Sequence, residues 1–93
     1  MYNLIFTQSY ENRVKNFLKR HPEVTGQYQK TLQLLELNPL HQSLRLHKFK
    51  TKNFEGHSVS INLSYRISLE FLIQDQSILL VNIGDHYEVY GKK

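Results

Sequence analysis

The stretch ILLVNIGDHYEVY, residues 78–90, begins with the most apolar run of the chain and ends in ionisable and aromatic side chains. Residues 78–83 have the length and composition of a strand that is buried inside a sheet. Gly84 interrupts the run, and His86 and Tyr90 follow where the end of a small domain would normally fray. Because a strand that delivers such side chains to a surface is a common way to build an active site, we expect the other elements to be arranged around this stretch.

Two strands with alternating apolar and polar side chains are predicted just before the buried strand. Residues 58–64 form the first, residues 65–73 form the second, and residues 74–77 form the turn that follows. The apolar positions are Val59, Ile61 and Leu63 in the first strand, and Tyr65, Ile67, Leu69, Phe71 and Ile73 in the second. Such alternation is typical of strands that bury only one face.

The first half of the chain has the period of two amphipathic helices that follow a short strand at residues 2–7. Thr7 can cap the first helix, Pro22 is well placed to open the second, and Pro39 stops it. The apolar stripes are Tyr10, Val14, Phe17 and Leu18 in the first helix, and Val24, Tyr28, Leu32 and Leu35 in the second, widened by Leu34 and Leu37. Two helices with a tight connection predict a helical hairpin.

The predicted fold class is α+β, with the element order β-α-α-β-β-β. Residues 44–49 also alternate but are too polar for a central strand, and residues 50–56 are predicted as a loop. The helical hairpin should pack on one face of a mostly antiparallel sheet, which gives a two-layer domain over residues 1–93. The other sheet face would carry Ser58, Ser60, Asn62, Arg66, Ser68 and Glu70, and by alternation Asn82, Gly84 and His86.

Composition excludes several classes of protein. The 93 residues contain no cysteine, which excludes disulfides and thiolate metal sites, and the histidines are too scattered to predict a structural zinc. We predict no metal and no cofactor. The N-terminal residues lack the features of a signal peptide, and no run is long enough for a membrane span, so we expect a cytoplasmic protein that is not associated with a membrane.

Positive charge is concentrated in the middle of the chain. Twelve Lys and Arg against eight Asp and Glu give a formal net charge of +4. The cationic side chains between residues 41 and 66 are Arg45, Lys48, Lys50, Lys52 and Arg66, opposed only by Glu55, whereas residues 67–90 contain no Lys or Arg. This distribution favours a polyanion-binding middle segment, although an ordinary solvated surface would have the same composition.

Three motifs resemble the RelE/ParE superfamily of type II toxins, and most closely its YafQ-type branch. They are LRLHKF at residues 44–49, YRI at residues 65–67, and IGDH at residues 83–86 followed four residues on by Tyr90. The resemblance implies a RelE-like fold and a toxin that cleaves mRNA on the ribosome and thereby inhibits translation. It also implies a cognate antitoxin protein as a partner, besides the ribosome and mRNA.

Metal-free RNA cleavage requires a base for the 2′-hydroxyl, an acid for the leaving 5′-oxygen, and a cation that stabilises charge on the phosphate. Imidazole suits both proton transfers and guanidinium suits the phosphate. The resemblance therefore implies that His86 and His47 transfer protons, that Arg66 binds phosphate, and that Tyr90 stacks on a base or orients the phosphate. The side chains expected to bind RNA phosphates are Arg45, Lys48, Lys50 and Lys52.

Each of these residues also has a purely structural interpretation. His86 could be a surface residue near a frayed end, and His47 could be solvated in a basic loop. Arg66 could form a cross-strand ion pair with Glu70 or Glu88. Tyr90 could be an aromatic plug at the edge of the core. His21 and His41 match no motif, so we interpret both as ordinary surface residues.

The sequence also departs from the family pattern. YafQ-like proteins have a further His and an Asp near the start of the central hairpin, where Ser60 and Ser64 match best and His57 lies out of register. This departure keeps two alternatives open. One is a ParE-like toxin that binds DNA gyrase without nuclease activity, and the other is a catalytically weakened member that mainly binds its antitoxin.

Overall fold

The computed structural model describes residues 1–72 and 75–91. The elements are β1 (Asn3–Phe6), α1 (Gln8–Arg20), the 3₁₀ turn η1 (Pro22–Val24), α2 (Thr25–Leu37), the 3₁₀ turn η2 (Gln42–Leu44), β2 (His47–Lys50), β3 (Glu55–Ser60), β4 (Tyr65–Leu72), β5 (Ser77–Asp85) and α3 (His86–Tyr90). The strands form one sheet in the order β1-β5-β4-β3-β2, in which β1 is parallel to β5 and the other neighbours are antiparallel. The predicted α+β class and its mostly antiparallel sheet are confirmed, and β2 and α3 are additions to the predicted order.

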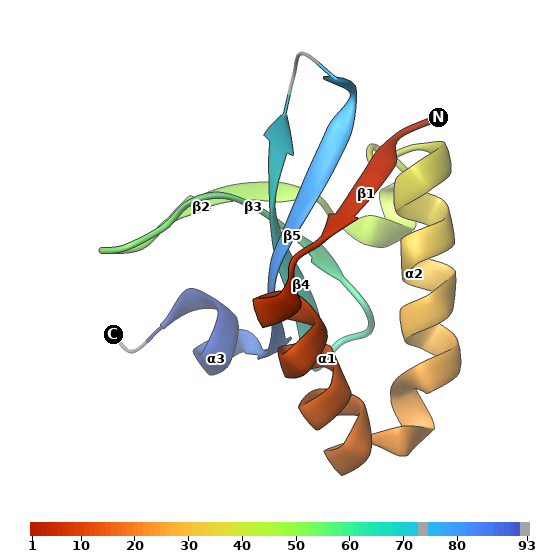
Figure 1. The fold of residues 1–93 in the computed structure, drawn as a ribbon, viewed down its shortest axis with the longest axis vertical. Helices are drawn as coiled ribbons and strands as arrows, with labels where there is room; N and C mark the ends of the chain where they lie inside the picture. Colours follow the sequence, from red (N-terminus) through yellow and green to blue (C-terminus); the bar gives the residue numbers. More distant parts are fainter. Residues whose placement is uncertain (73–74, 92–93) are drawn as a thin grey trace.

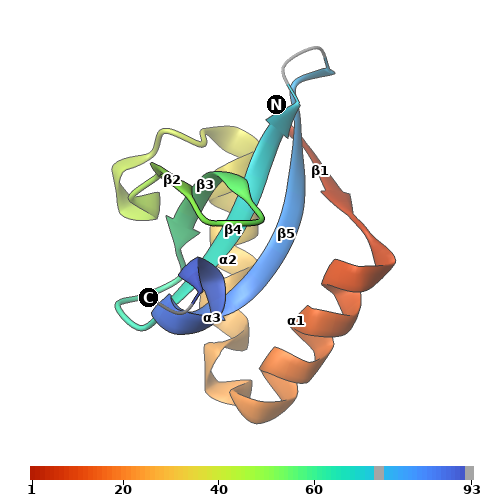
Figure 2. The ribbon, with the colours of Figure 1, turned by 90° about the vertical axis from the view of Figure 1, so that its left-hand side faces the viewer.

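The helices lie on both sides of the sheet. Helices α1 and α2 lie on one side, whereas α3 lies on the opposite side, near the β2–β3 hairpin (Figures 1 and 2). The two long helices are joined by a buried hydrogen bond of 3.1 Å between the hydroxyls of Tyr10 and Tyr28. The core between helices and sheet includes Phe17, Leu35, Val59, Ile67, Leu69, Ile78 and Leu80. The sheet face that carries α3 is therefore the one available for a site.

The helix boundaries follow local chemistry. The Thr7 hydroxyl accepts a hydrogen bond of 3.1 Å from the backbone N–H of Tyr10 and caps α1 as predicted. Pro22 opens η1, a 3₁₀ turn that leads into α2, so the second α-helix begins at Thr25 and not at the proline. The prediction for Leu37 was wrong, because its side chain is 66% exposed. In the last turn of α2 the apolar stripe ends at the buried Leu35.

Strand β3 is displaced toward the N-terminus relative to the prediction. It begins at Glu55 and ends at Ser60, and Leu63 is 93% exposed beyond it. The reason is the Asn62 side chain, whose Oδ1 accepts hydrogen bonds from the backbone N–H groups of Ser64 (2.8 Å) and Tyr65 (2.9 Å) and so folds the chain into a turn. The predicted loop is correspondingly shorter and consists of residues 51–54.

Strands β4 and β5 confirm the predicted central pair. Of the positions predicted for this region, Ile73 and Gln74 lie outside the described residues. Gln76 turns the chain with a left-handed φ of 50°, and a bulge between Ser68 and Leu69 shifts the register between the two strands. Beyond the bulge, Arg66 is opposite Gly84.

The end of the chain, for which no helix was predicted, forms the short helix α3. Asp85 and Glu88 form a capping box, in which each side chain accepts a hydrogen bond from the other's backbone N–H, at 2.8 and 2.9 Å. Gly84 allows α3 to fold back over the sheet, because a Cβ at this position would lie 2.7 Å from the Cβ of Glu88. Val89 is the buried residue of α3. The C-terminal motif is therefore held against the open sheet face.

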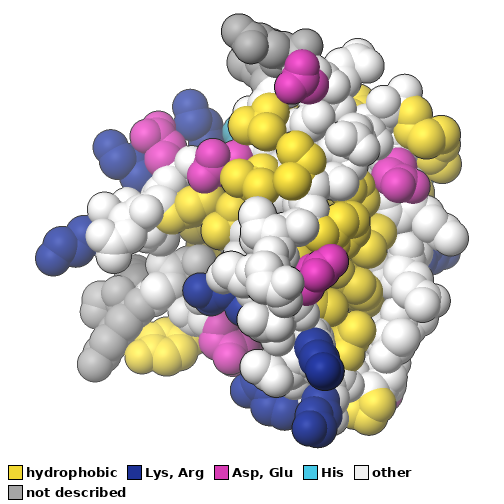
Figure 3. Space-filling model, in the orientation of Figure 1, with side chains coloured by type: hydrophobic (Ala, Val, Ile, Leu, Met, Phe, Trp, Pro, Cys, Tyr) yellow, Lys and Arg dark blue, Asp and Glu magenta, His cyan; other side chains and the backbone are white. Residues whose placement is uncertain are grey.

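The molecular surface carries an apolar groove and several clusters of positive charge. The groove, of 250 Å³, lies between α1 and α2 and is lined by Phe6, Tyr10, Val14, Tyr28 and Leu32, together with Glu11 and Lys15. In Figure 3, Lys and Arg side chains gather at the lower end of the molecule, where α1 ends, and on the left, where the β2–β3 hairpin projects. Within residues 1–72 and 75–91, no helix has the length and apolar character needed to cross a membrane.

Candidate active site

Three strands and α3 bring the predicted residues together on the sheet face opposite the long helices. His47 begins β2 and is paired with Ser58 of β3, while Arg66 lies near the start of β4. Tyr90 ends α3, and its hydroxyl reaches both His47 and Ser58. We call His47, Ser58, Arg66, His86 and Tyr90 the open-face cluster.

Arg66 is held by neutral acceptors. Its Nε donates to the Ser58 hydroxyl over 2.9 Å, and its Nη2 donates to the backbone carbonyl of Arg45 over 2.9 Å. Arg45 has a left-handed φ of 48° at the end of η2, which directs this carbonyl to the guanidinium. Nη2 also lies 3.4 Å from Nδ1 of His47. Arg66 is thus fixed in position with its positive charge uncompensated by these partners.

The ion pair considered for Arg66 is not formed. Among residues 1–72 and 75–91, the carboxylates within 4.0 Å of a cationic side chain are those of Glu23, beside His21, and Glu88, beside Arg20. Glu88 is 3.7 Å from Arg20 and therefore ties α3 to α1 instead. An arginine that is ordered by neutral groups keeps its charge available for an anion.

Tyr90 is the centre of the cluster. Its hydroxyl lies 2.6 Å from Oγ of Ser58 and 3.3 Å from Nε2 of His47. Its ring centroid lies 4.4 Å from that of His86 and 4.5 Å from that of Phe49, against which it packs edge to face. Tyr90 therefore packs as an aromatic plug, which was its structural interpretation. It also contacts both histidines of the open-face cluster, His47 and His86.

The two histidines of the cluster differ in their surroundings. Desolvation, followed by the positive charges of Arg66, His86 and His57, lowers the pKa of His47 below its ordinary value. Near pH 7 its imidazole is therefore neutral. His86 is exposed at the first position of α3, with one side of its ring against Tyr90. The arrangement offers one imidazole suited to accept a proton and a second that is open to solvent.

The three lysines lie near the cluster but do not join it. Lys48 and Lys50 alternate with His47 and Phe49 along β2, so their side chains leave the opposite face of this edge strand. Lys52 is in the hairpin loop, and all three lysines are exposed. They form a charged rim along the sheet edge.

Sequence reasoning missed Ser58 as a member of the site. Its side chain is fully buried, and its hydroxyl joins Arg66 to Tyr90. Alternation already assigned it to the same face as Arg66, but a serine offered no sign that it would be covered by α3. Ser60 is opposite Arg66, yet its hydroxyl donates to the backbone carbonyl of Asn62 over 2.7 Å.

The remaining histidines have structural environments. The prediction for His21 was wrong: its ring packs against Phe17 and Tyr65, and Nδ1 lies 3.3 Å from the Tyr65 hydroxyl. His41 is exposed, as predicted, and its Nδ1 accepts a hydrogen bond of 3.1 Å from the backbone N–H of Ser43. His57 packs edge to face against Phe71, with ring centroids 5.1 Å apart.

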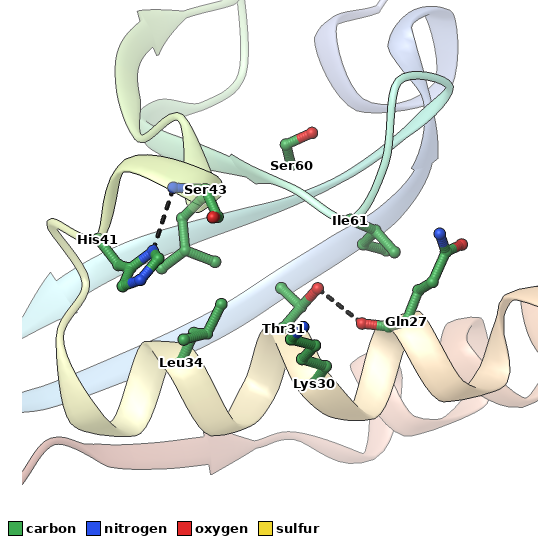
Figure 4. Close-up of a pocket in the computed structure, with 9 residues that line it drawn as sticks. Gln27, Lys30, Thr31, Leu34, His41, Ser43, Ser60 and Ile61 are labelled. Carbon is green, nitrogen blue, oxygen red and sulfur yellow. Dashed lines mark hydrogen bonds between the residues drawn. The ribbon is translucent and has the colours of Figure 1, made fainter.

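A pocket of 390 Å³ lies apart from the cluster, between α2, η2 and the end of β3 (Figure 4). Its lining residues are Gln27, Lys30, Thr31, Leu34, His41, Ser43, Leu44, Ser60 and Ile61. The Thr31 hydroxyl donates to the backbone carbonyl of Gln27 over 2.8 Å, so this polar group already has a partner. A second pocket, of 400 Å³, has Tyr90 in its wall, between the hairpin loop, β5 and α3. The cluster itself lies on an open face, which suits a long polymer better than a small enclosed ligand.

In the part of the chain that the structure describes, no three or more His, Cys, Asp or Glu side chains are grouped so that they could hold a metal ion.

The fold is that of the RelE/YafQ-like toxins. The chain is similar to the crystal structure of YafQ from E. coli strain BL21(DE3), with a TM-score of 0.76 and 15% identity over 98% of this chain and 100% of that chain. It is also similar to a metal-bound toxin from Helicobacter pylori, with a TM-score of 0.70 and 16% identity over 97% and 100% of the two chains. A copper-bound mutant toxin from the same organism matches with a TM-score of 0.64 and 22% identity, over 97% and 100%.

No protein-family model matches the chain, and no curated protein matches it in sequence. At 15–22% identity the structural matches establish the fold. The RelE-like fold that the motifs at residues 44–49, 65–67 and 83–90 implied is therefore confirmed.

Proposed function

We propose that this protein is the toxin of a type II toxin–antitoxin system and a metal-free endoribonuclease that cleaves mRNA on the ribosome. The observation that carries the proposal is Arg66, an ordered guanidinium with neutral partners, beside two imidazoles that meet on Tyr90. The fold shared with YafQ supports it. Fold alone does not define an activity, so the chemistry of the cluster bears most of the argument.

Arg66 would bind the phosphate at which cleavage occurs. Its guanidinium can donate two parallel hydrogen bonds to phosphate oxygens, and hydrogen bonds between ionised groups are about twice as strong as those between neutral groups. Charge that builds on these oxygens in the transition state would be stabilised by a group already in position, which is the arrangement that contributes most to catalysis.

His47 and His86 would divide the two proton transfers. The neutral imidazole of His47 would take the proton from the 2′-hydroxyl, and O2′ would bond to phosphorus. His86, in its protonated form, would give a proton to O5′ as the P–O5′ bond breaks, which leaves a 2′,3′-cyclic phosphate. The lowered pKa of His47 supports its role as the base. Tyr90 would orient both imidazoles and offer a ring on which a base can stack.

Binding to the ribosome and mRNA would use the charged rim. Lys48, Lys50 and Lys52 are exposed along the edge beside the cluster, where they can neutralise phosphates without sequence preference. We also propose that the protein acts in the cytoplasm and is neutralised by a cognate antitoxin. The uncovered groove between α1 and α2 supports a protein partner, because apolar surface of this kind is commonly covered by one.

The decisive test is induced expression of wild type, His86→Ala and Tyr87→Ala, with and without co-expression of any small protein encoded beside this gene. Tyr87 is the neighbour of His86 in α3 and is 59% exposed, so Tyr87→Ala is the matched control. We expect wild type and Tyr87→Ala to arrest growth and translation, and His86→Ala to be harmless. Equal toxicity of wild type and His86→Ala would refute the proposed role of His86.

The same experiment separates the alternatives. Filamentation with DNA damage, and no loss of translation, would identify a gyrase-binding toxin of the ParE type. Harmless expression of wild type would identify a weakened member that binds its antitoxin. The second alternative has one observation in its favour: Ser60 and Ser64 match family positions that carry His and Asp, and the hydroxyl of Ser60 is turned to the Asn62 carbonyl, away from the cluster.

A further inference from the structure

The hydrogen bonds of the open-face cluster begin at Arg66. A guanidinium has no acceptor, so Nη2 of Arg66 donates to Nδ1 of His47 over 3.4 Å. When Nδ1 accepts this bond, the neutral ring of His47 has its proton on Nε2, which lies 3.3 Å from the Tyr90 hydroxyl. The Tyr90 hydroxyl lies 2.6 Å from Oγ of Ser58, and Oγ accepts a bond from Nε of Arg66 over 2.9 Å. These contacts lead from Arg66 through His47, Tyr90 and Ser58 back to Arg66.

We propose that Arg66 masks the base His47 in the free protein, and that binding of a phosphate group to Arg66 releases it. This inference rests on the proposed function and describes how the same site is regulated. In the free arrangement the lone pair of Nδ1 faces Nη2, and Nε2 already has a proton. Neither nitrogen of His47 can accept the proton of a 2′-hydroxyl until Nη2 of Arg66 turns away from Nδ1, while Nε of Arg66 stays anchored on Ser58.

A phosphate can compete for Arg66 because the present partners of Nη2 are neutral. They are the Arg45 carbonyl at 2.9 Å, the Ser58 carbonyl at 3.4 Å and the imidazole of His47. Hydrogen bonds from a guanidinium to an anionic phosphate are stronger than these. When Nη2 turns to the phosphate, Nδ1 of His47 is freed, and the negative charge of the phosphate offsets the positive charge that had made this nitrogen less basic.

Other groups act on His47 besides Arg66 of β4. Tyr90 and His86 approach it from α3. His57 of β3 is paired with Lys48 and lies on the other face of the sheet, from which it also acts on His47 by its charge. An imidazole carries charge only when it is protonated, whereas a guanidinium keeps its charge. Arg66 is also the cationic group in direct contact with the His47 ring, so its substitution tests the inference most directly.

Nuclear magnetic resonance of the free protein with ¹⁵N-labelled histidine tests the inference without RNA. In wild type we expect His47 to carry its proton on Nε2 and to titrate below the ordinary pKa of histidine. Titration with inorganic phosphate should shift the pKa of His47 upward. Arg66→Gln should have the higher pKa from the outset and should not respond to phosphate. Ser58→Ala should lie between the two, since Arg66 keeps its charge and loses an anchor.

Ser60→Ala is the matched control, because Ser60 lies on the same face of β3 and bonds to Asn62 instead of Arg66. It should titrate like wild type. A proton on Nδ1 in free wild type, an unchanged pKa in Arg66→Gln, or no response of wild type to phosphate would each overturn the masking role. If Arg66→Gln does not fold, Ser58→Ala decides the comparison. If the wild-type protein does not cleave RNA but His47 titrates as expected in every variant, the proposed function is refuted and the masking role of Arg66 stands.

Discussion

The molecule contains two histidine–tyrosine pairs with the same hydrogen-bond length and different surroundings. In the His21–Tyr65 pair and in the His47–Tyr90 pair, a ring nitrogen lies 3.3 Å from the tyrosine hydroxyl. The first pair packs on the buried Phe17, between α1 and the start of β4. The second pair lies on the open sheet face beside Arg66 and contacts a second imidazole, His86.

The difference shows that residue type alone does not make a site. In the His21–Tyr65 pair the carboxylate of Glu23 lies 3.9 Å from His21, and the rings fill space at the edge of the core. In the His47–Tyr90 pair the guanidinium of Arg66 contacts the imidazole of His47. Desolvation is the larger cause of the lowered pKa of His47, and the charge of Arg66 is the second. We therefore expect the His47–Tyr90 pair, which is beside the fixed cation Arg66 and the exposed ring of His86, to take part in chemistry. We expect the packed His21–Tyr65 pair to contribute to stability.

Removing one imidazole from each pair should produce the largest contrast. We expect His47→Ala to lower ribosome-dependent mRNA cleavage by about 10²- to 10⁴-fold, which is typical for the loss of a general base, with little change in the free energy of unfolding. His21→Ala should retain cleavage but lower the free energy of unfolding by about 1–2 kcal/mol, because its contacts with Phe17 and Tyr65 are lost. Cleavage assays and urea unfolding of both variants measure this. The comparison fails if both variants lose activity equally.

Arg66 is the group that the His21–Tyr65 pair lacks. Arg66→Ala should lower cleavage by about 10²- to 10³-fold, since a preorganised donor to the developing charge is removed. Arg66→Lys should recover only part of this, because an ammonium keeps the charge but cannot donate in a bidentate fork. Single-turnover cleavage measures both effects. Full activity of Arg66→Lys would show that a point charge is sufficient and that the fixed geometry of the guanidinium is unimportant.

The charged rim flanks only the His47–Tyr90 pair. Changing Lys48, Lys50 and Lys52 to Ala should weaken ribosome binding by roughly tenfold at low salt and should make binding less dependent on salt, because fewer counterions are released. Co-sedimentation with ribosomes across a salt series measures the slope. The matched control changes Lys15, Lys19 and Lys30 on the helices, which alters the net charge equally. If both triple variants show the same slope, the rim has no special role.

The smallest effect concerns pH and stability. The pKa of His47 is lower in the folded protein than in the unfolded chain, so the unfolded state binds more protons as the pH falls through about 6.5. Folding should therefore be favoured by neutral His47 above this pH and should lose that contribution below it. His47→Gln should lose less stability than wild type between pH 8 and pH 5 in urea unfolding. A larger loss in His47→Gln would reverse the sign of the argument.

The parts of the fold with strong periodicity could be predicted from sequence. The stripe of Tyr10 and Phe17 and the alternation of Ile67 and Leu69 are repeated patterns, and both were placed correctly in the core. Single polar contacts were harder to foresee. The Asn62 side chain ended β3 early and exposed Leu63, and no periodic signal announces such a turn.

The cluster could be predicted in its charged and aromatic members but not in its connections. His47, Arg66, His86 and Tyr90 were recognised from motifs, and the structure brings them together, while their catalytic roles remain predictions. The signal for α3 was present in the sequence, since Asp85 and Glu88 have the spacing of a capping box. Ser58 could not be found in this way, because its burial depends on Tyr90, which lies 32 residues away in the sequence.

The bare backbone of Gly84 has a practical consequence for work on this protein. A single added methyl group would lie 2.7 Å from the Cβ of Glu88, so α3, with His86 and Tyr90, would have to shift on the sheet. The toxic function that we propose would make the gene difficult to clone and express. We expect substitution at position 84 to yield folded protein without the assembled cluster, from which antibodies, partner screens and crystals could be obtained without selecting for escape mutations.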